Sequence, residues 1–322
     1  MKAAIVEKLG SAPVYADFPE PTVGPGEVLV RPSAAGIHPL VRGLASGSHY
    51  GAAGATVPFG VGVDCVGRLE NGDRVYTGFP RKPYGTMAER VAVPSMMCMP
   101  IPDAIDDAVA AAAANPGMSA WLALVWRAEV TKGQTVLILG ATGVAGQIAV
   151  QLAKHLGAAK VIAAGRNPAM LAKLPALGAD HVVQLEGDRA TLAAKFREAA
   201  GEGGIDAIID YVWGPPAEAA IEAITKTGFG AAKRVRLVQV GGGAGANITL
   251  PAAVLRSSAL EITGTGGGTV PVSELVAAVP KVLALIAKGV IAIEVERMPL
   301  SDVTKAWATT GDGRRTVITI GA

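Results

Sequence analysis

The sequence predicts an α/β protein in which a doubly wound parallel sheet is joined to a second, partly barrel-shaped β domain. From Leu122 to about Thr265, strand-like and helix-like segments alternate, which is typical of a doubly wound parallel sheet. The preceding hundred residues are rich in Gly and Pro and contain short β-branched runs, which is typical of antiparallel strands. With 322 residues, half of them hydrophobic, the chain can bury a core in each of two domains.

The elements can be placed in chain order. A helix is expected at Asp106–Ala114. The expected strands of the parallel sheet are Thr135–Leu139, Lys160–Ala164, His181–Gln184, Ala207–Asp210, Arg234–Val240 and Leu260–Thr263. A helix at Val272–Lys288 and a strand at Arg315–Ile320 should follow. Because the last strand must pair somewhere, we expect it to complete the N-terminal domain, so that residues 1–120 and 266–322 form one domain and residues 121–265 the other.

Composition excludes several classes of protein. The net charge is only +2 and the basic residues are scattered, so we expect neither a nucleic-acid partner nor a membrane surface. The N-terminus reads Met-Lys-Ala-Ala-Ile-Val-Glu and lacks a signal-peptide core before charge intervenes. Cys65 and Cys98, the two cysteines of the sequence, argue against a disulfide framework and fit a reducing cytoplasm.

Three glycines follow the first predicted strand of the parallel sheet and precede a helical pattern. Gly140, Gly143 and Gly146 lie at the point where strand turns into helix. Such glycines let the backbone approach another molecule closely, and the unpaired N–H groups of the first helical turn attract a phosphate. We therefore expect Thr142, Gly143, Val144 and Ala145 to cradle a pyrophosphate. The spacing departs from the commoner G-x-G-x-x-G, and a purely structural tight turn is the alternative.

The residues after the second strand indicate which dinucleotide is bound. An acidic residue there would bind the ribose 2′-hydroxyl of NAD, but the sequence reads Gly165-Arg166-Asn167. A guanidinium can donate two hydrogen bonds to a phosphate, so these residues favour NADPH and its 2′-phosphate. A solvated loop cation is the alternative for Arg166.

Small residues also end the fifth predicted strand, at the sheet edge where ligands bind in such folds. Val240, Gly241 and Gly242 would let a nicotinamide lie against the backbone. Arg256, Arg314 and Arg315 are left undecided between contact with the cofactor and solvation, although solvation is favoured for the Arg314–Arg315 pair.

Several motifs in this order resemble those of a known family. They are Gly26–Arg31, Ala34–Ile37, Asn71–Val75, Tyr84–Glu89, Gly117–Ala120 and Gly140–Gly146. The chain resembles, over essentially its whole length, the medium-chain dehydrogenase/reductase superfamily and specifically its zinc-free quinone oxidoreductase branch. The resemblance implies a GroES-like catalytic domain, a Rossmann domain, an active site in the cleft between them, and NADPH as the cofactor.

The sequence departs from the zinc-dependent members of that superfamily. Where they carry a cysteine ligand and a histidine ligand, this chain has His38 and Val63. His38 with Cys65 would lack the third protein ligand that catalytic zinc requires. The lobe with four structural cysteines is also missing, since Val91–Ile101 contains Cys98 alone. We therefore expect no metal, and we expect Cys65 to be an ordinary core residue.

The resemblance also points to catalytic candidates. His38 corresponds to an asparagine found near the nicotinamide, and could donate a proton or bind the ribose; a packed loop histidine is the alternative. Tyr50 could donate a hydrogen bond to a carbonyl oxygen, or be a surface residue. Trp213 could wall a flat substrate, or pack under a loop. A tyrosine common in the branch is replaced by Gly43, which departs from the quinone-binding pattern.

These observations predict an NADPH-dependent, zinc-independent oxidoreductase that reduces quinones or similar conjugated carbonyl compounds. The alternatives are an enone or enoyl double-bond reductase and a nucleotide-binding protein with little catalytic role. The sixth strand, Leu260–Thr263, would lie at an edge of the sheet, and an uncovered edge invites pairing. Relatives commonly dimerise there, so we expect a two-fold symmetric homodimer.

Overall fold

The computed structural model describes residues 1–225, 232–309 and 312–321, and its chain divides into two compact units. Unit 1 comprises Met1–Asn115 and Val279–Ala322, and unit 2 comprises Pro116–Ala278. The sequence had suggested divisions after residues 120 and 265. Both observed divisions fall inside helices, α2 (Asp107–Trp121) and α8 (Val272–Ala287), each of which contains a proline beside the division, Pro116 and Pro280.

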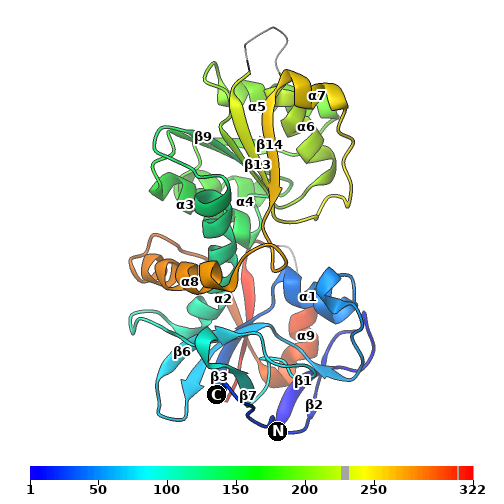
Figure 1. The fold of residues 1–322 in the computed structure, drawn as a ribbon, viewed down its shortest axis with the longest axis vertical. Helices are drawn as coiled ribbons and strands as arrows, with labels where there is room; N and C mark the ends of the chain where they lie inside the picture. The colour runs from blue at the N-terminus through cyan, green and yellow to red at the C-terminus, as the bar shows by residue number, and fades with distance from the viewer. Residues whose placement is uncertain (226–231, 310–311, 322) are drawn as a thin grey trace. The chain divides into compact units, whose positions relative to one another are not determined.

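Unit 2 contains a six-stranded parallel sheet with the strand order β11-β10-β9-β12-β13-β14. The strands are β9 (Thr135–Leu139), β10 (Lys160–Gly165), β11 (His181–Gln184), β12 (Ala207–Asp210), β13 (Arg234–Gln239) and β14 (Ala259–Gly264). This confirms the doubly wound sheet and all six predicted strands to within a residue at each end. Figure 1 shows β9, β13 and β14 in this unit.

Helices connect these strands on both faces of the sheet. They are α3 (Val144–His155), α4 (Pro168–Leu171), the 3₁₀ turn η4 (Leu174–Leu177), α5 (Arg189–Ala200), α6 (Gly214–Ile224) and α7 (Ala252–Ser257). The chain moves from β9 to β10 in one direction along the sheet and from β12 to β13 in the other. Because parallel crossovers are right-handed, α3 and α6 lie on opposite faces, and the direction reverses between β9 and β12.

One apolar core of unit 2 lies between the sheet and the helices α5 and α6. Leu137, Ile162 and Ile208 come from three neighbouring strands, and they pack in one cluster with Phe196 of α5 and Ile221 of α6. These side chains are at most 2% exposed. The central strands β9, β10 and β12 are buried on both faces, which is why they appear in the sequence as nearly continuous apolar runs.

Unit 1 is built of two sheets. A three-stranded sheet has the order β2-β1-β4, and a larger sheet has the order β15-β16-β3-β5-β6-β8, with β7 paired to β3. The strands are β1 (Lys2–Val6), β2 (Val14–Asp17), β3 (Glu27–Gly36), β4 (Phe59–Gly60), β5 (Asp64–Leu69), β6 (Arg74–Gly78), β7 (Val91–Pro94), β8 (Met99–Pro100), β15 (Val295–Pro299) and β16 (Arg315–Thr319). The C-terminal strand β16 pairs antiparallel with β3, so it joins the N-terminal domain, where the sequence analysis expected it to pair.

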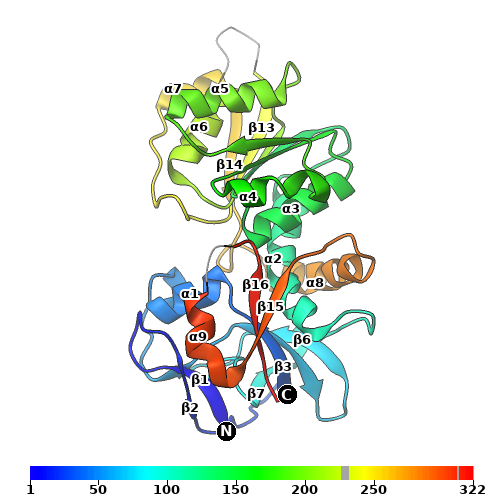
Figure 2. The same ribbon diagram turned by 180° about the vertical axis from the view of Figure 1, so that it is seen from behind.

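The helical pieces that lie wholly within unit 1 are short. They are α1 (Pro39–Ser46), η1 (Tyr50–Ala52), η2 (Ser95–Met97), η5 (Leu300–Asp302) and α9 (Val303–Ala308). Val41 of α1 and Val303 of α9 share a buried cluster with Cys65 of β5 and Ile318 of β16. Figure 2 shows the red C-terminal segments α9 and β16 alongside the blue N-terminal α1 and β3. The two ends of the sequence therefore build one core.

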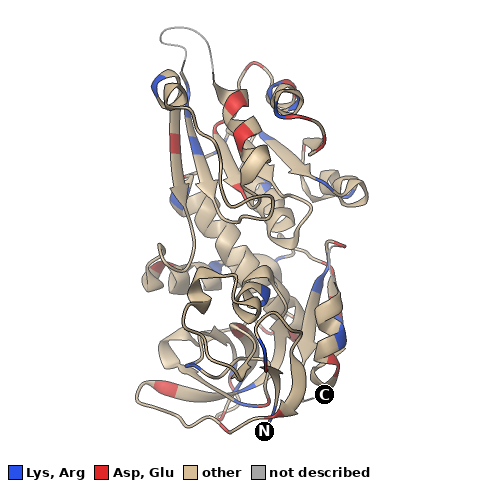
Figure 3. Ribbon diagram, turned by 90° about the vertical axis from the view of Figure 1, so that its right-hand side faces the viewer, with Lys and Arg blue, Asp and Glu red and all other residues tan. Residues whose placement is uncertain are grey.

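The helix α2 continues into a π-helical segment, Leu122–Arg127, and together they form a long apolar stretch. The helical stretch Asp107–Arg127 is long and apolar enough to cross a membrane, but 67% of its most apolar part is buried inside the protein. Such burial is typical of a core helix. Figure 3 shows Lys and Arg interspersed with Asp and Glu along the chain.

Candidate functional site

The turn between β9 and α3 is shaped for close approach of a ligand to the backbone. Gly140 has a φ of +84°, which a side chain disfavours. A Cβ on Gly146 would lie 2.3 Å from the carbonyl oxygen of Gly140, so only glycine fits there. Gly143 is the N-cap of α3 and has no side chain that could cap the first N–H groups of the helix. The first N–H groups of α3, from Val144 and Ala145, are therefore available to a phosphate.

The end of β10 packs directly against this turn. A Cβ on Gly165 would lie 2.4 Å from Cγ2 of Thr142, so the glycine allows the two segments to meet. Arg166, the next residue, is exposed and makes no ion pair with any described residue. Asn167 instead accepts a hydrogen bond through its Oδ1 from the backbone N–H of Met170, at 3.2 Å, and caps α4. The structure thus brings Thr142, Gly143 and Gly165 together and leaves the Arg166 side chain free to bind an anion.

The ends of β12 and β13 meet at the same edge of the sheet. The backbone N–H of Val240 donates to the carbonyl oxygen of Asp210 at 2.7 Å. A Cβ on Gly241 would lie 2.6 Å from the carbonyl oxygen of Tyr211, and one on Gly140 would lie 2.9 Å from Cγ1 of Val212. The turns after β9, β12 and β13 therefore converge where the winding direction reverses, which is the position at which open α/β sheets bind their ligands.

Asp210 holds the turn after β12, a role that the sequence analysis missed. Its Oδ1 accepts hydrogen bonds from the backbone N–H groups of Val212 and Trp213, each at 2.8 Å. Its Oδ2 is buried and has no partner among the described residues. Burial raises the pKa of this carboxyl group to about 6, against the opposing effect of the two N–H donors. A carboxylate at the end of an apolar parallel strand was the signal that could have identified it.

Trp213 follows this turn in a conformation that bulky residues rarely adopt. Its φ is +57°, in the left-handed region, and the Asp210 bond to its N–H holds the backbone there. The indole is half-buried and packs on the apolar cluster between the sheet and α5 and α6. The packing of Trp213 agrees with the second interpretation, and its role as a wall for a flat substrate stays a prediction.

In unit 1, His38 belongs to a buried polar group. It immediately precedes α1, is 2% exposed, and places its Nε2 2.8 Å from Oδ1 of Asp64 on β5. The hydroxyl of Tyr76 on β6 donates to Oδ2 of the same carboxylate. Because a carboxylate only accepts hydrogen bonds, Nε2 carries the hydrogen. His38 Nδ1 is buried and has no protein partner among the described residues.

A buried guanidinium lies in the same electrostatic environment. Arg315 is 8% exposed and donates from Nη1 to the carbonyl oxygen of Ile37 at 2.8 Å. Burial lowers its pKa to about 10, and the nearby Asp64 charge opposes that shift. Burial, with the Asp64 charge, raises the pKa of both Tyr76 and Cys65 well above their ordinary values. The preference for a solvated Arg315 is therefore wrong, because the side chain serves a bond inside unit 1.

The other undecided arginines lie at the surface. Arg314 forms an ion pair with Asp312 at 2.5 Å. Arg256 is exposed on α7 and makes no ion pair within the part of the chain described. Tyr50 is 68% exposed, and its ring lies 4.0 Å from that of His49. No hydrogen bond between described residues joins Tyr50 to the His38–Asp64 pair.

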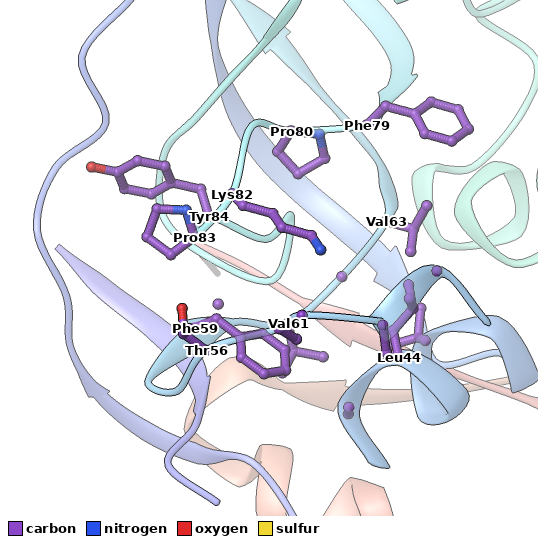
Figure 4. A pocket seen from close by; sticks show the side chains of 18 residues that line it. Leu44, Thr56, Phe59, Val61, Val63, Phe79, Pro80, Lys82, Pro83 and Tyr84 are labelled. Atoms are coloured by element: carbon purple, nitrogen blue, oxygen red, sulfur yellow. The ribbon is translucent and has the colours of Figure 1, made fainter. Parts of the chain in front are cut away.

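A cavity of about 270 Å³ opens in unit 1 between α1 and the segment 79–84. Figure 4 shows Leu44, Phe59, Val61 and Val63 along one side and the segment that carries Lys82 along the other. Val63 precedes Asp64, and α1 begins directly after His38. The cavity therefore shares its walls with the segments that carry the buried polar group.

The residues around His38 do not fit a catalytic zinc ion. His38 Nε2 is bonded to Asp64, residue 63 is a valine, and the Cys65 thiol is fully buried with a raised pKa. Across residues 1–225, 232–309 and 312–321, no three His, Cys, Asp or Glu side chains gather as metal ligands do. The dinucleotide cradle of unit 2, by contrast, fits a pyrophosphate, because the Gly146 Cα and the uncapped helix end leave the backbone open.

Comparison with known proteins supports this description. The model of the zinc-binding dehydrogenase family matches residues 144–288. A probable NADPH-dependent quinone reductase of Emericella nidulans is 29% identical over 95% of this chain and 96% of its own length. A quinone oxidoreductase of Sus scrofa is 30% identical over 225 residues, 66% of each chain.

Solved structures extend the likeness over the whole chain. A mycobacterial quinone oxidoreductase superposes with a TM-score of 0.84 and 26% identity, covering 99% of both chains. The chain belongs to the medium-chain dehydrogenase/reductase superfamily, in its quinone reductase-like branch.

Proposed function

We propose that this protein is an NADPH-dependent, zinc-independent oxidoreductase that transfers a hydride to quinones or similar conjugated carbonyl compounds. The observation that carries the proposal is the convergence of the glycine turn, the end of β10 with Arg166, and the end of β13 at one edge of the parallel sheet. The full-length similarity to a probable NADPH-dependent quinone reductase supports both the cofactor and the substrate class.

The cofactor is assigned to unit 2. The N–H groups of Val144 and Ala145 would bind the pyrophosphate, and Arg166 the 2′-phosphate, since no acidic residue stands there to bind a free ribose hydroxyl. Gly241 and Gly242 would leave room for the nicotinamide, which supplies the hydride when NADPH is bound. Thr142, Gly165, Asn167 and Val240 shape the surrounding backbone.

Proton delivery is assigned to His38. When its imidazole is protonated, Nδ1 would donate a proton to the oxygen on which charge builds up during reduction, while Nε2–H stays bonded to Asp64. Tyr76 fixes the other oxygen of that carboxylate. Because Nδ1 is buried, the side chains that cover it must move aside when a substrate binds. Tyr50 is proposed to donate a hydrogen bond to a substrate carbonyl, and Trp213 to stack on a flat ring.

A conjugated acceptor suits a site without a Lewis acid. Negative charge that develops on a quinone is spread over the conjugated system, so hydrogen-bond donors can stabilise it. Zinc independence predicts that exhaustive chelation leaves the activity unchanged. Stoichiometric zinc that is removed together with activity would contradict the proposed reaction.

The test is a panel of acceptors at one fixed NADPH concentration, namely quinones, enones, enoyl thioesters and aldehydes. We expect the quinones to give the highest kcat/KM. Faster reduction of enones or enoyl thioesters would make the protein a double-bond reductase. No turnover with any acceptor, despite tight NADPH binding, would leave a nucleotide-binding role.

We also propose a cytoplasmic homodimer. Cys65 and Cys98 are both free thiols, which fits a reducing compartment. Strand β14 is the last in the order of the parallel sheet and pairs with β13. Its Ile262 side chain is 38% exposed, so an apolar group and unpaired backbone lie together at an edge that a second copy could extend.

A further inference from the structure

We infer that the cavity between α1 and the segment 79–84 binds an apolar substituent of the substrate that ends in a carboxylate. This inference rests on the proposed function for the identity of the reacting ring, and on the geometry of unit 1 for the substituent. It narrows the substrate class from quinones in general to quinones, or similar conjugated carbonyls, with an anionic side chain.

The walls of the cavity are almost entirely apolar. Aliphatic and aromatic side chains come from α1, from residues 51–56, from the link between β4 and β5, and from the segment 79–84. Those that carry the argument are Val41, Leu44, Ala55, Phe59, Val61 and Val63. Burying a methylene against such walls strengthens binding by up to about fourfold. The cavity therefore favours an alkyl chain over a polar group along most of its length.

The size of the cavity limits the length of that chain. Its volume of about 270 Å³ lies just below the ~300–1,000 Å³ of sites for drug-sized ligands. The cavity therefore suits a short chain, such as five carbons with a terminal carboxylate, rather than a long one.

One cation faces this apolar space. Figure 4 shows the side chain of Lys82 reaching into the cavity from the segment 79–84. No Asp or Glu stands among the described residues that line the cavity, and Lys82 makes no ion pair with any described residue. The Tyr84 hydroxyl points away and donates to the carbonyl oxygen of Glu20 at 3.2 Å. An anion at the end of an apolar chain is the complement of this arrangement.

Backbone strain marks the same segment. Phe79 has a φ of +60°, and its N–H donates to the carbonyl oxygen of Val63 at 2.8 Å. This unfavourable conformation holds a ring that is 48% exposed at the side of the cavity. A non-glycine residue held in this region points to a functional constraint. Phe79 and Val63 both line the cavity, so the strained residue is part of its wall.

The test compares three naphthoquinones that share one reacting ring: 2-methyl-, 2-hexyl- and 2-(5-carboxypentyl)-1,4-naphthoquinone. We expect KM to fall at least tenfold from methyl to hexyl and further for the carboxypentyl compound, with kcat within about threefold. Lys82→Gln should raise KM about threefold to tenfold for the carboxypentyl compound alone. Lys82→Arg, which keeps the charge, should have the KM of the unmodified protein. Lys8→Gln, at an exposed lysine away from the cavity, serves as the matched control.

A second variant tests the cavity itself. Ala55→Phe should fill it and remove the advantage of both long chains while leaving the methyl compound unaffected. Ala53→Phe, two residues away and outside the lining, is its control. Equal KM values for the three quinones, or an Ala55→Phe variant that keeps the chain preference, would overturn the subsite.

Failure of the subsite can be distinguished from failure of the proposed function. Calorimetric titration of the full-length protein with hexanoate, hexanol and acetate reports on the cavity without turnover. We expect hexanoate to bind more tightly than hexanol, acetate not to bind, and Lys82→Gln to weaken hexanoate alone. If no quinone is reduced but this pattern holds, the reaction is wrong and the subsite stands. If quinones are reduced but hexanoate binds no better than acetate, the subsite is wrong.

Discussion

His38 Nε2 lies 2.8 Å from Oδ1 of Asp64, and both side chains are at most 4% exposed. The carboxylate is held on its other side by Tyr76 and stands in the field of the buried Arg315. Zinc-dependent members of the superfamily are expected to have a metal ligand at the position of residue 38. Here the Nε2 atom of His38 is instead hydrogen-bonded to Asp64. The pair therefore orients the ring and fixes its hydrogen, which leaves Nδ1 as the free position.

The first prediction concerns the stability of this buried group. Asp64→Asn removes the charge that balances Arg315 and should lower the free energy of unfolding by about 3–5 kcal/mol, because an uncompensated buried charge is left behind. Urea denaturation measures the change. Asp103→Asn, at an exposed aspartate of the same unit, should change it by less than about 0.5 kcal/mol. Equal effects of the two substitutions would mean that Asp64 does not balance a buried cation.

The second prediction separates His38 from cofactor binding. His38→Gln should lower kcat for quinone reduction by roughly 10²-fold or more, since a positioned general acid contributes on that scale. The Kd for NADPH should stay within about twofold. Steady-state kinetics and fluorescence titration give the two values. Tyr50→Phe should have the smaller effect on kcat, and the reverse order would assign proton delivery to Tyr50.

The third prediction concerns cofactor choice. Arg166→Ala should weaken NADPH binding by about 1.5–3 kcal/mol, because a charge-assisted hydrogen bond to the 2′-phosphate is lost. The affinity for NADH should not change. Lys132→Ala, at an exposed lysine of the same unit, is the control. Equal affinities of the unmodified protein for NADPH and NADH would already contradict the assignment.

The fourth prediction uses the pH dependence of stability at Asp210. Its pKa is raised from 3.8 to about 6, so the folded protein holds this proton more tightly than the unfolded chain. The associated stability is present at low pH and is lost as the pH rises from about 4 to about 6. Asp210→Asn should therefore gain stability relative to the unmodified protein by roughly 2 kcal/mol between about pH 4 and pH 7.5. A difference that is independent of pH would show that the carboxyl group has an ordinary pKa.

The fifth prediction concerns assembly at β14. Light scattering at micromolar concentration should give the mass of a dimer. Ile262→Pro should give a monomer, because proline removes a backbone donor from an edge strand. Circular dichroism should show that the variant keeps its secondary structure. A monomeric unmodified protein would contradict the proposed dimer.

The sequence predicted the centre of the parallel sheet well because the strands β9, β10 and β12 are buried on both faces. Runs such as Thr135–Leu139 are continuously apolar and end in glycines that the turn requires, so local pattern and tertiary environment agree. For the N-terminal unit, the sequence predicted only a partly barrel-shaped domain of antiparallel strands, without the order in which they pair. Its strand β15 is half-exposed and ends in proline, so the alternation that marks a strand is weak.

The dinucleotide cradle could be found in the sequence, but the group around His38 could not. The cradle residues are neighbours in the chain, whereas His38 and Asp64 are 26 residues apart. Asp64 and Tyr76 meet because β5 and β6 pair antiparallel, with Val66 opposite Tyr76. In that register, Tyr76 lies diagonally across from Asp64, close enough for a hydrogen bond. The register itself cannot be obtained from the composition of the sequence or the spacing of its residues.

The central claim is most directly tested by measuring kcat/KM for NADPH and for NADH with 1,4-naphthoquinone, using protein freed of metal by exhaustive chelation. We predict rapid oxidation of NADPH, at least tenfold more efficient than that of NADH, with no loss of rate on chelation. Equal rates with the two cofactors, activity restored only by added zinc, or no oxidation of NADPH would contradict it.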